Sequence, residues 1–587
     1  MTVRRAGEKG GKDPVNPQTV SPGREETAAG LKACLEKLQG ERFAERLWQK
    51  DGSLWRADPR EQEALGRALG WLDVVGKMEQ NLADLVGFAQ EVRGFGFSHV
   101  VHMGMGGSSL APIVFQHMFQ PGPEGLPLIV LDTTDPATVA GLEQRVALAT
   151  TLFIVASKSG TTAEPLAFDD YFYDRVKALK GERAGENFVA ITDSATPLAE
   201  SARQRGFRRT FLNPSDIGGR YSALSYFGLL PAALMGLDVG RILAGAAAMA
   251  RACGPSVPAS ENPGMVLGAA MGEMARTGRD KVTFLLPVEL ATLGMWLEQL
   301  IAESTGKEGK GILPVAGETC GSPSAYGNDR LFVSLQLKGH GDPGLEEGVR
   351  ILKAADQPLI AIELHEESAI GQEFFRWEVA TAVAGAVLGI DPFDQPNVQE
   401  SKDATNRFLR GVAERGSLKE PAPGMVHGPL SFFTANGADR PEHLLSDFFS
   451  QANPGDYISL QAYLTEEAPS GGLLQAIRLR LRDGLRLATT IGYGPRFLHS
   501  TGQLHKGGPP TGLFIQLTCR DAIDVSIPGR PYTFGIFKKA QALGDLEALQ
   551  KHRRRVMRID LGDDARKGLT LLRQLVERAV PMGPKGA

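Results

Sequence analysis

Cysteine is scarce in this sequence, with four residues among 587, at positions 34, 253, 320 and 519. None of them forms a CxxC pair, which argues against a structural zinc site, and four scattered thiols make no disulfide framework. A secreted module stapled by disulfides is therefore disfavoured, and the cytosol is the expected location.

Long apolar runs and an excess of one charge are also missing. No stretch is long enough to span a bilayer, and the N-terminus lacks the apolar core of a signal peptide. Lysine and arginine total 64 against 68 aspartates and glutamates, a formal net charge of -4. This balance gives no electrostatic footprint for nucleic acid or an acidic membrane. No HExxH motif or paired His/Asp cluster suggests a metal, so we expect no cofactor.

What is present indicates a large α/β protein. A chain of 587 residues, 42% of them hydrophobic and 70 of them glycine, is expected to form two or three domains rich in turns. Residues 1–25 are polar, are broken by glycine and proline, and are predicted to be disordered. From residue 26 to 95, leucines such as Leu31, Leu35 and Leu38 recur at helical spacing, which predicts a helical brace.

Apolar strands, polar loops and helices alternate over residues 96–240 and again over residues 241–420. This order is typical of doubly wound parallel sheets, whose ligands bind at the carboxyl ends of the strands. Two polar loops, Gly104 to Ser109 and Ser157 to Thr162, follow apolar strands and so fall at such ends.

Both loops have the chemistry of a phosphate site. A glycine-rich turn lets backbone N–H groups approach an anion, and the helix that follows adds its positive N-terminal dipole. Ser157, Lys158, Ser159 and Thr162 add hydroxyls and one cation, which suits a phosphate monoester. The dinucleotide motif is weak because Ser109 replaces its third glycine, and no P-loop motif is present. For each loop taken singly, a helix cap with a turn is an equally good interpretation.

The stretch LGMWLEQLIAESTGKEGKGILP, residues 293–314, is the most informative one. Its apolar spacing predicts a helix that ends near Gly306. Gln299 and Glu303 would then project side by side. Partial burial and a place in the last helical turn would raise the proton affinity of Glu303 toward that of a general base. The alternative is an amphipathic helix whose boundary glutamate is solvated.

Two positively charged residues outside this stretch are also of interest, one before it and one after it. Arg220 comes after two glycines and before an apolar segment, so a role with a ligand or a transition state is favoured over a solvated charge. Lys402 begins a helix after a loop that Pro392 and Pro396 make rigid. Without context, a solvated lysine is the simpler interpretation of Lys402.

Residues 441–587 are predicted to form a further α/β unit, the C-terminal extension. A loop between two of its predicted strands holds His499 and His505 together with an arginine and a lysine. This composition resembles a fragment of a site, and a surface loop with incidental histidines is the alternative.

Five motifs in one order, GMGGSS, SKSGTT, IGGRYS, EQLIAESTGKEGKG and FDQPNVQESK, resemble those of glucose-6-phosphate isomerases. Their wording and spacing are most similar to the isomerase part of bifunctional transaldolase/glucose-6-phosphate isomerase proteins. The resemblance covers about residues 28–420. It implies an α/β fold with two sugar isomerase subdomains, each holding a doubly wound parallel sheet, between the N-terminal helices and the C-terminal extension. It also implies the interconversion of glucose 6-phosphate and fructose 6-phosphate, and a homodimer.

The resemblance also implies a role for each matched residue. Glu303 matches the base that moves a proton between C2 and C1, Arg220 the arginine beside the enediolate, and Lys402 the lysine that assists ring opening. The sugar phosphate would be held by Gly107, Ser108, Ser157, Lys158, Ser159, Thr162, Gly219, Gln299 and Gln395.

One departure from the family pattern concerns ring opening. The family usually has a histidine in a GQH-like segment soon after the glutamate helix, and Arg330 occupies that place here. An arginine cannot give up a proton at neutral pH. We therefore hypothesise that His505, or else His499, of the extension folds over the sugar and supplies the proton shuttle.

Other functions are weighed against this one. Another phosphosugar isomerase, or dual action on mannose 6-phosphate, is possible because a C2 epimer differs at the carbon that loses the proton. A sugar-phosphate-binding regulator would need the phosphate loops but not Glu303, Arg220 and Lys402. Transaldolase activity is disfavoured because no eightfold strand–helix series precedes the isomerase region, although a separate transaldolase partner is possible.

Overall fold

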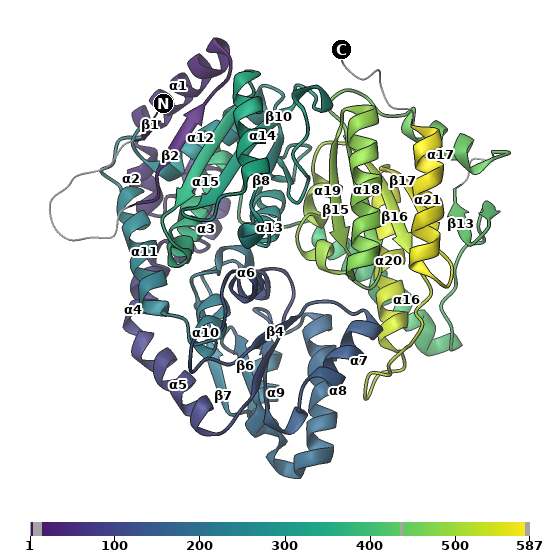
Figure 1. The fold of residues 1–587 in the computed structure, drawn as a ribbon. Coiled ribbons are helices and arrows are strands. Elements are labelled where there is room, and N and C mark those ends of the chain that lie inside the picture. The colour runs from purple at the N-terminus through teal and green to yellow at the C-terminus, as the bar shows by residue number, and fades with distance from the viewer. Residues whose placement is uncertain (1, 4–14, 435–437, 581–587) are drawn as a thin grey trace.

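Three lobes, each built round a β-sheet, make up the protein (Figure 1). The structure is a computed structural model, which describes residues 2–3, 15–434 and 438–580. Helix α13 (Leu293–Thr305) lies in the middle of the view in Figure 1, where the lobes meet. It contacts α6 (Leu110–Met118) of the first lobe, α15 (Ile370–Leu388) of the second and α19 (Gly502–Gly507) of the third.

The first lobe holds a parallel sheet of five strands in the order β4-β3-β5-β6-β7. The strands are β3 (His99–Met103), β4 (Leu128–Leu131), β5 (Thr151–Ala156), β6 (Phe188–Thr192) and β7 (Arg209–Leu212). The lobe's helices, besides α6, are α7 (Pro136–Arg145), α8 (Ala163–Lys180), α9 (Pro197–Gln204) and α10 (Tyr226–Leu234). The strand order reverses at β3, and the two predicted phosphate loops follow β3 and its neighbour β5. Ligand sites of doubly wound sheets lie at such a switch point, so the predicted sheet type is confirmed.

The second lobe holds a mixed sheet in the order β1-β2-β11-β10-β8-β9. Its strands are β1 (Thr2–Val3), β2 (Gln18–Ser21), β8 (Lys281–Leu285), β9 (Leu313–Val315), β10 (Arg330–Leu337) and β11 (Leu359–Leu364). Strands β8 to β11 pair in parallel, whereas β2 runs antiparallel to both β11 and β1.

Strand β2 corrects the prediction that residues 1–25 are disordered. Val20 pairs with Ile360 and is buried, and the nearby Asn16 and Gln18 are also buried. The edge of β11 supplies the backbone partners, which a short polar segment does not reveal in the sequence. Residue 1 and residues 4–14 of the predicted tail lie outside the described residues.

Helices surround this sheet and connect it to the first lobe. They are α1 (Glu25–Gly40), α2 (Phe43–Trp48), α3 (Pro59–Gly66), α4 (Val74–Gln80), α5 (Leu82–Gly94), α11 (Val239–Ala252), α12 (Pro263–Arg276), α14 (Pro343–Ala354) and α16 (Val398–Arg415), besides α13 and α15. The predicted helical character of residues 26–95 is confirmed. Helices α12 and α15 pack closely because Gly264, Gly268 and Gly272 face α15. A Cβ added to Gly268 would lie 2.3 Å from the carbonyl oxygen of Ala380.

The extension holds the third sheet, in the order β12-β13-β17-β16-β14-β15. Its strands are β12 (Met425–His427), β13 (Leu430–Phe433), β14 (Tyr457–Tyr463), β15 (Ala488–Tyr493), β16 (Gly512–Thr518) and β17 (Arg555–Asp560). Its other helices are α17 (Pro441–Phe449), α18 (Ala468–Leu485), α20 (Phe534–Lys551) and α21 (Ala565–Ala579). Strands β12 and β13 precede residue 441, so the sheet includes residues ahead of the predicted boundary.

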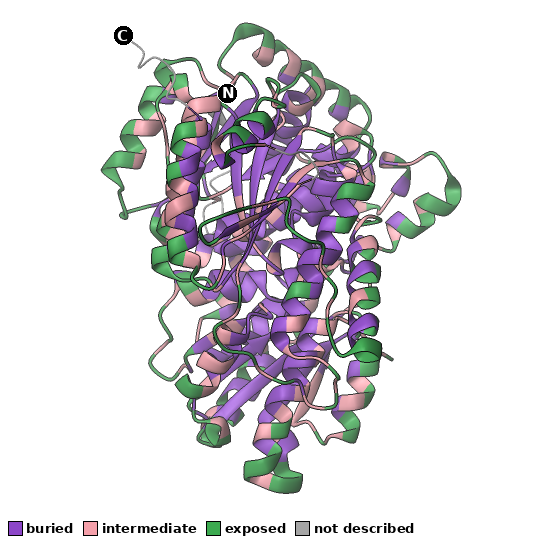
Figure 2. Ribbon diagram, turned by 90° about the vertical axis from the view of Figure 1, so that its right-hand side faces the viewer, coloured by how far each residue is buried: buried purple, intermediate pink, exposed green. Residues whose placement is uncertain are grey.

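The extension packs against the other two lobes through α20. This helix is buried along most of its length and contacts α16 on one side and β14, β16 and β17 on the other. Figure 2 shows the same pattern in the molecule as a whole, with buried strands and helices inside and exposed turns outside.

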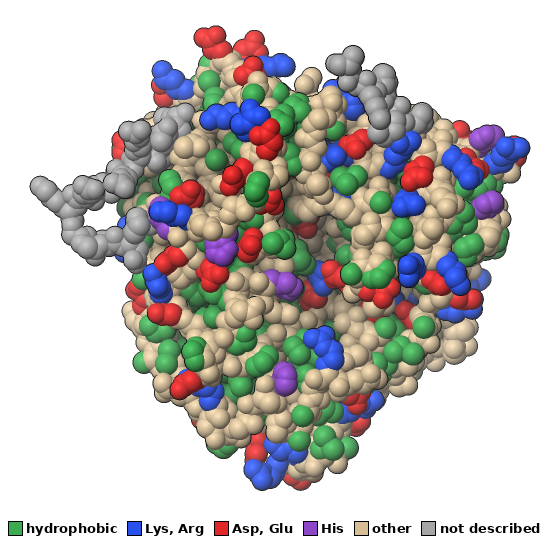
Figure 3. Space-filling model, in the orientation of Figure 1, with side chains coloured by type: hydrophobic (Ala, Val, Ile, Leu, Met, Phe, Trp, Pro, Cys, Tyr) green, Lys and Arg blue, Asp and Glu red, His purple; other side chains and the backbone are tan. Residues whose placement is uncertain are grey.

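The surface is mixed in charge on the face that Figure 3 shows, where acidic and basic side chains are interspersed. Among the residues that the structure describes, no helix is long and apolar enough to cross a membrane.

Candidate active site

Glu303 lies on α13, which ends at Thr305 as the sequence predicted. Its side chain is buried, with 4% of the residue exposed, and accepts a hydrogen bond of 3.0 Å from Gln299 Nε2. The predicted neighbourhood of these two side chains is confirmed. Burial raises the pKa of Glu303, and the charges of Arg220, His499 and Lys307 offset part of the rise. A buried carboxylate with a raised pKa is suited to taking a proton.

Arg220 holds the positive charge beside this carboxylate. It lies in the short 3₁₀ helix η6 (Gly219–Tyr221), and its Nη1 is 3.7 Å from Glu303 Oε2. Its Nε donates to Ser304 Oγ at 2.7 Å, and its Nη2 donates to the carbonyl oxygens of Pro392 and Asp394 at 2.7 and 2.9 Å. The Arg220 guanidinium group has five N–H donors, and with them it holds helix α13 and the loop 391–397 together.

Glycines let the turns around Arg220 approach each other. Gly107 and Ser108 belong to the 3₁₀ helix η3 (Gly106–Ser108), and Ser108 is buried. A Cβ on Gly107 would lie 2.1 Å from the carbonyl oxygen of Gly219, so no larger residue fits. Below this turn, the buried His102 hydrogen-bonds the carbonyl oxygen of Ser108, and burial lowers its pKa to about 4. His102 is therefore a core histidine.

The second predicted phosphate loop lies at the N-terminus of α8. The buried Ser157 donates a hydrogen bond of 3.1 Å to Thr162 Oγ1, and the exposed Ser159 shares one of 2.9 Å with Thr161. Lys158 has partners of its own, because its ammonium pairs with Asp193 and donates to the carbonyl oxygen of Ser215 at 3.1 Å. The loop therefore presents hydroxyls and a helix N-terminus, with the lysine charge held to one side.

A cleft of about 200 Å³ opens beside this loop. It is lined by Thr161, Thr162, Ala163, Glu164, Val398, Gln399, Ser401, Lys402, Thr405, Asn406, Leu498, His499, Phe537 and Gln541. Lys402 is exposed on α16 and reaches the cleft as expected, next to the phosphate loop. Gln395, which was expected to bind the sugar, is exposed in the loop before α16 and is not among the lining residues.

His499 connects the cleft to the base. It ends the 3₁₀ helix η10 (Arg496–His499) of the extension, and its carbonyl oxygen accepts a hydrogen bond of 2.8 Å from Gln299. Its Nε2 lies 2.8 Å from Glu164 Oε1. The backbone also approaches the first glycine turn closely, since a Cβ on Gly106 would lie 2.7 Å from the carbonyl oxygen of His499.

Glu164 was not singled out from the sequence, although it follows Thr162 by two residues. It is buried, and Gln541 Nε2 of α20 also donates to its Oε1, at 2.7 Å. Burial tends to raise the pKa of Glu164, but the charge and the hydrogen bond of His499 hold it below its usual range. An ionised carboxylate therefore fixes the orientation of the His499 ring.

His505, the first choice from the sequence for ring opening, does not line the cleft, whereas its alternative His499 does. Its ring is buried among Tyr457, Phe497 and Phe514, with centroid distances of 6.2, 6.0 and 5.0 Å. Burial, and then the charge of Lys506, lowers its pKa. Two histidines in one loop look alike in a sequence, and only packing decides which one lines the cleft.

Arg330, at the place of the family histidine, is a structural residue. It is fully buried and donates to Thr283 Oγ1 at 2.7 Å, to Glu318 Oε1 at 3.2 Å and to the carbonyl oxygen of Leu487 at 3.2 Å. These bonds join the second sheet to the extension. Arg330 therefore anchors the lobe that brings His499 to the cleft.

The extension is also tied to the first lobe by buried ion pairs. Arg496 reaches both carboxylate oxygens of Asp132, at 2.6 and 2.9 Å, and Lys538 lies 2.7 Å from Asp135. Bidentate pairs of this kind fix orientation as well as contact. Among the described residues, no group of three or more His, Cys, Asp or Glu is placed to hold a metal ion.

Comparison with known proteins shows to which family this chain is related. A model of the phosphoglucose isomerase family matches residues 71–316. The glucose-6-phosphate isomerase of Rubrobacter xylanophilus is 32% identical over 370 residues, which are 54% of this chain and 84% of that protein. The glucose-6-phosphate isomerase of Symbiobacterium thermophilum is 30% identical over 383 residues, 57% of this chain and 85% of that protein.

Two solved structures share the fold. A glucose-6-phosphate isomerase from Chlamydia trachomatis superposes with a TM-score of 0.53 at 20% identity, over 68% of this chain and 89% of that one. A hypothetical protein from Thermus thermophilus gives 0.55 at 24% identity, over 66% and 99%. With close relatives covered over most of their length, the chain belongs to the glucose-6-phosphate isomerase family.

Proposed function

We propose that this protein interconverts D-glucose 6-phosphate and D-fructose 6-phosphate through an enediol intermediate. The family assignment supports this reaction. The single observation that carries it is Glu303, a buried carboxylate with a raised pKa, lying 3.7 Å from a buried arginine. A regulator that only senses a sugar phosphate has no use for such a base.

The phosphate would be bound by the hydroxyl-rich turns of the first lobe. Ser108, Ser157, Ser159 and Thr162 offer hydroxyls, and the N-terminus of α8 offers backbone N–H groups and its dipole. Lys158 is paired with Asp193, which offsets its positive charge, so we expect it to contribute less to phosphate binding than the hydroxyls do. Gly107 lets the turn of Ser108 come close to the turn of Gly219 and Arg220, because a Cβ at position 107 would lie 2.1 Å from the carbonyl oxygen of Gly219.

Glu303 would transfer the proton between C2 and C1. Its raised pKa brings a carboxylate nearer to the proton affinity that general base catalysis needs. Arg220 would stabilise the negative oxygens of the enediolate, and its buried hydrogen bonds hold it in place before the reaction begins. Gln299, which donates to Glu303, would keep the carboxylate in one orientation.

Ring opening requires proton transfer at the ring oxygen, and Lys402 and His499 are the residues proposed for it. Both line the cleft beside the phosphate loop. Glu164 bonds Nε2 of the His499 ring and is itself held by Gln541, so Nδ1 of His499 would be the atom that serves the sugar. Gln395 is exposed in the loop before α16 and does not line the cleft, so we assign it no contact with the sugar.

A proton-exchange experiment tests this function. Fructose 6-phosphate is incubated with the protein in D₂O, and glucose 6-phosphate formed is analysed for deuterium at C2. An isomerase that uses an enediol yields product labelled at C2, with or without a chelator present. A regulator binds the sugar phosphate and yields no product, which would refute the proposal. Location in the cytosol, a homodimer and association with a transaldolase stay predictions from the sequence.

A further inference from the structure

Gln503 of the extension lies between the two helices that carry Glu303 and Lys402. It belongs to α19, a helix of six residues, and its side chain is fully buried. Its hydrogen bonds go to Gly306 and Asn397, which are not among the residues assigned to the sugar. The side chain thus acts between elements of the protein.

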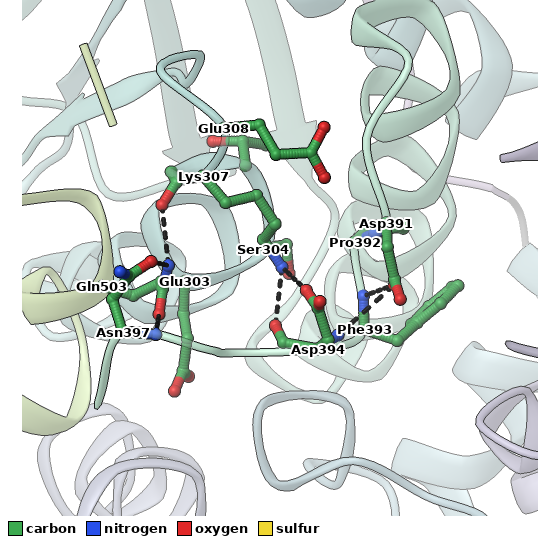
Figure 4. A network of polar contacts seen from close by, with 12 residues as sticks. Glu303, Ser304, Lys307, Glu308, Asp391, Pro392, Phe393, Asp394, Asn397 and Gln503 are labelled. Carbon is green, nitrogen blue, oxygen red and sulfur yellow. Dashed lines mark hydrogen bonds and ion pairs between the residues drawn. The ribbon is translucent and has the colours of Figure 1, made fainter. Parts of the chain in front are cut away.

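One amide group joins the ends of both helices (Figure 4). Nε2 of Gln503 donates to the carbonyl oxygen of Gly306 at 3.0 Å and to Asn397 Oδ1 at 2.8 Å. Oε1 of Gln503 accepts from the backbone N–H of Asn397 at 2.9 Å. Gly306 directly follows α13 and Asn397 directly precedes α16, so the bridge spans from the base helix to the lysine helix.

The side chain of Asn397 bonds Gln503 and does not cap helix α16. Asparagine before a helix is favoured because its side chain accepts a hydrogen bond from the first helical turn. The side chain of Asn397 makes no such bond to α16 and points to Gln503 instead. The bridge therefore takes precedence over local helix capping.

The bridge is tightly enclosed. A Cβ added to Gly507 would lie 2.4 Å from Asn397 Oδ1, 2.7 Å from Gln503 Nε2 and 2.8 Å from the carbonyl oxygen of Gly306. A Cβ on Gly306 would lie 2.3 Å from Leu504 Cα. The end of α13 and the short α19 are therefore in backbone contact, and two glycines make that contact possible.

The middle of the loop 391–397 is held as well. Arg220 and Lys307 both donate to the carbonyl oxygen of Asp394, at 2.9 and 2.6 Å. Lys307 also pairs with the Asp394 carboxylate (Figure 4). Gln503 closes the loop at Asn397, and Lys402 follows on the next turn of α16. With the loop held at Asp394 and Asn397, these side chains help to set the position of α16 relative to α13.

We propose that Gln503 is a positioning residue for the isomerisation, which fixes the Lys402 helix against the Glu303 helix so that both groups face one sugar. The inference rests on the proposed function and deepens it. It gives the extension a second task besides supplying His499. A displacement of about 1 Å in a reacting group can lower a rate about 10²-fold. The amide of Gln503 can therefore affect the rate although it is not assigned to the sugar.

The test is a double-mutant cycle between Gln503→Leu and Lys402→Ala. Leucine keeps most of the volume and removes every hydrogen bond of the bridge. We expect kcat for cyclic glucose 6-phosphate to fall about tenfold to a hundredfold, with KM little changed because the phosphate loops are intact. In the Lys402→Ala background, Gln503→Leu should have little further effect. On a substrate analogue that cannot cyclise, its effect should be small.

Gln475→Leu is the matched control. Gln475 of α18 also joins the extension to the second lobe, donating to the carbonyl oxygen of Gly317 at 2.9 Å and to Thr319 Oγ1 at 3.2 Å. Its loss should change stability without changing kcat. If Gln503→Leu does not fold, Asn397→Ala removes one of the three bonds and should give the same pattern in milder form.

Three results would overturn the inference: an unchanged kcat for the Gln503 variant, an equal loss in the Lys402→Ala background, or an equal loss on the substrate that cannot cyclise. An inactive wild-type protein would instead refute the proposed function, and the inference with it. The two failures are therefore distinguishable.

Discussion

Glu303 and Lys402, the groups proposed to handle protons at two positions of the sugar, have very different surroundings. Glu303 is 4% exposed and is held by Gln299 and Arg220. Lys402 is exposed on the first turns of α16 and lines an open cleft. The buried side of the site is fixed before substrate arrives, whereas the open side depends on how α16 and the extension are placed.

The two sides also differ in the distance along the chain between their parts. Gln299 and Glu303 are one helical turn apart, so a single helix brings them together. His499 meets Glu164 from another lobe, and Gln541 completes the group from α20. A side chain near solvent needs such partners to keep one orientation, because water competes for its hydrogen bonds.

The largest effect on the buried side of the site is expected from Glu303→Gln, which keeps the size of the side chain and removes its basicity. We expect kcat to fall about 10²- to 10⁴-fold, with KM nearly unchanged, in steady-state assays. Glu298→Gln is the control, since burial raises the pKa of this neighbouring glutamate to about 7 and it has no assigned role. A near-normal kcat for Glu303→Gln would contradict the base assignment.

On the open side, His499→Asn should lower turnover of the cyclic sugar about a hundredfold, the weight of one positioned acid–base group. A substrate that cannot cyclise should be affected much less, because Glu303 is intact. His505→Phe is the control, since an aromatic ring suits its aromatic surroundings. Loss of turnover in the His505 variant, with normal rates in the His499 variant, would reverse this choice.

Substitutions in the phosphate loop, residues 157–162, should weaken the binding of substrate. Ser157→Ala with Thr162→Ala removes two hydroxyls that would bond a charged phosphate, and each such bond is worth about 1.5–3 kcal/mol. Because two bonds are lost, we expect KM, and the inhibition constant of inorganic phosphate, to rise about a hundredfold or more, with a smaller change in kcat. Unchanged inhibition by phosphate would place its binding elsewhere.

The smallest expected effect is a shift in the pH dependence of kcat/KM, which tests the buried side of the site. Burial raises the pKa of Glu303, so the acid limb of kcat/KM should lie above the ordinary range of a glutamate. Below that limb Glu303 is protonated and cannot take a proton. Arg220→Met removes a charge that lowers this pKa, and the limb should therefore move to higher pH. A limb that stays in place would mean that another group titrates.

Much of the framework follows from the sequence. The alternation of apolar strands and helices predicted the parallel sheet of the first lobe, because strands buried on both faces are apolar throughout. The end of α13 near Gly306 and the pairing of Gln299 with Glu303 follow from helical geometry. These features depend on residues within a few turns of one another.

The missed features depend on distant partners. Strand β2 forms only because β11 offers an edge, and Asn16 is bound by groups on α15 more than 350 residues away, such as Glu373. Glu164 gains its role from His499 across 335 residues. Contacts between residues so far apart leave no local pattern in the sequence. The sequence therefore predicted a tail at residues 18–21 and favoured His505.

By itself the sequence determined which residue types could do the chemistry and which secondary elements carry them, since propensity and periodicity act over short distances. Only the tertiary structure decided which histidine reaches the cleft, why Arg330 is an anchor, and how Gln503 joins two helices. Those outcomes depend on burial and on hydrogen bonds between lobes, and both are settled only when the whole chain has packed.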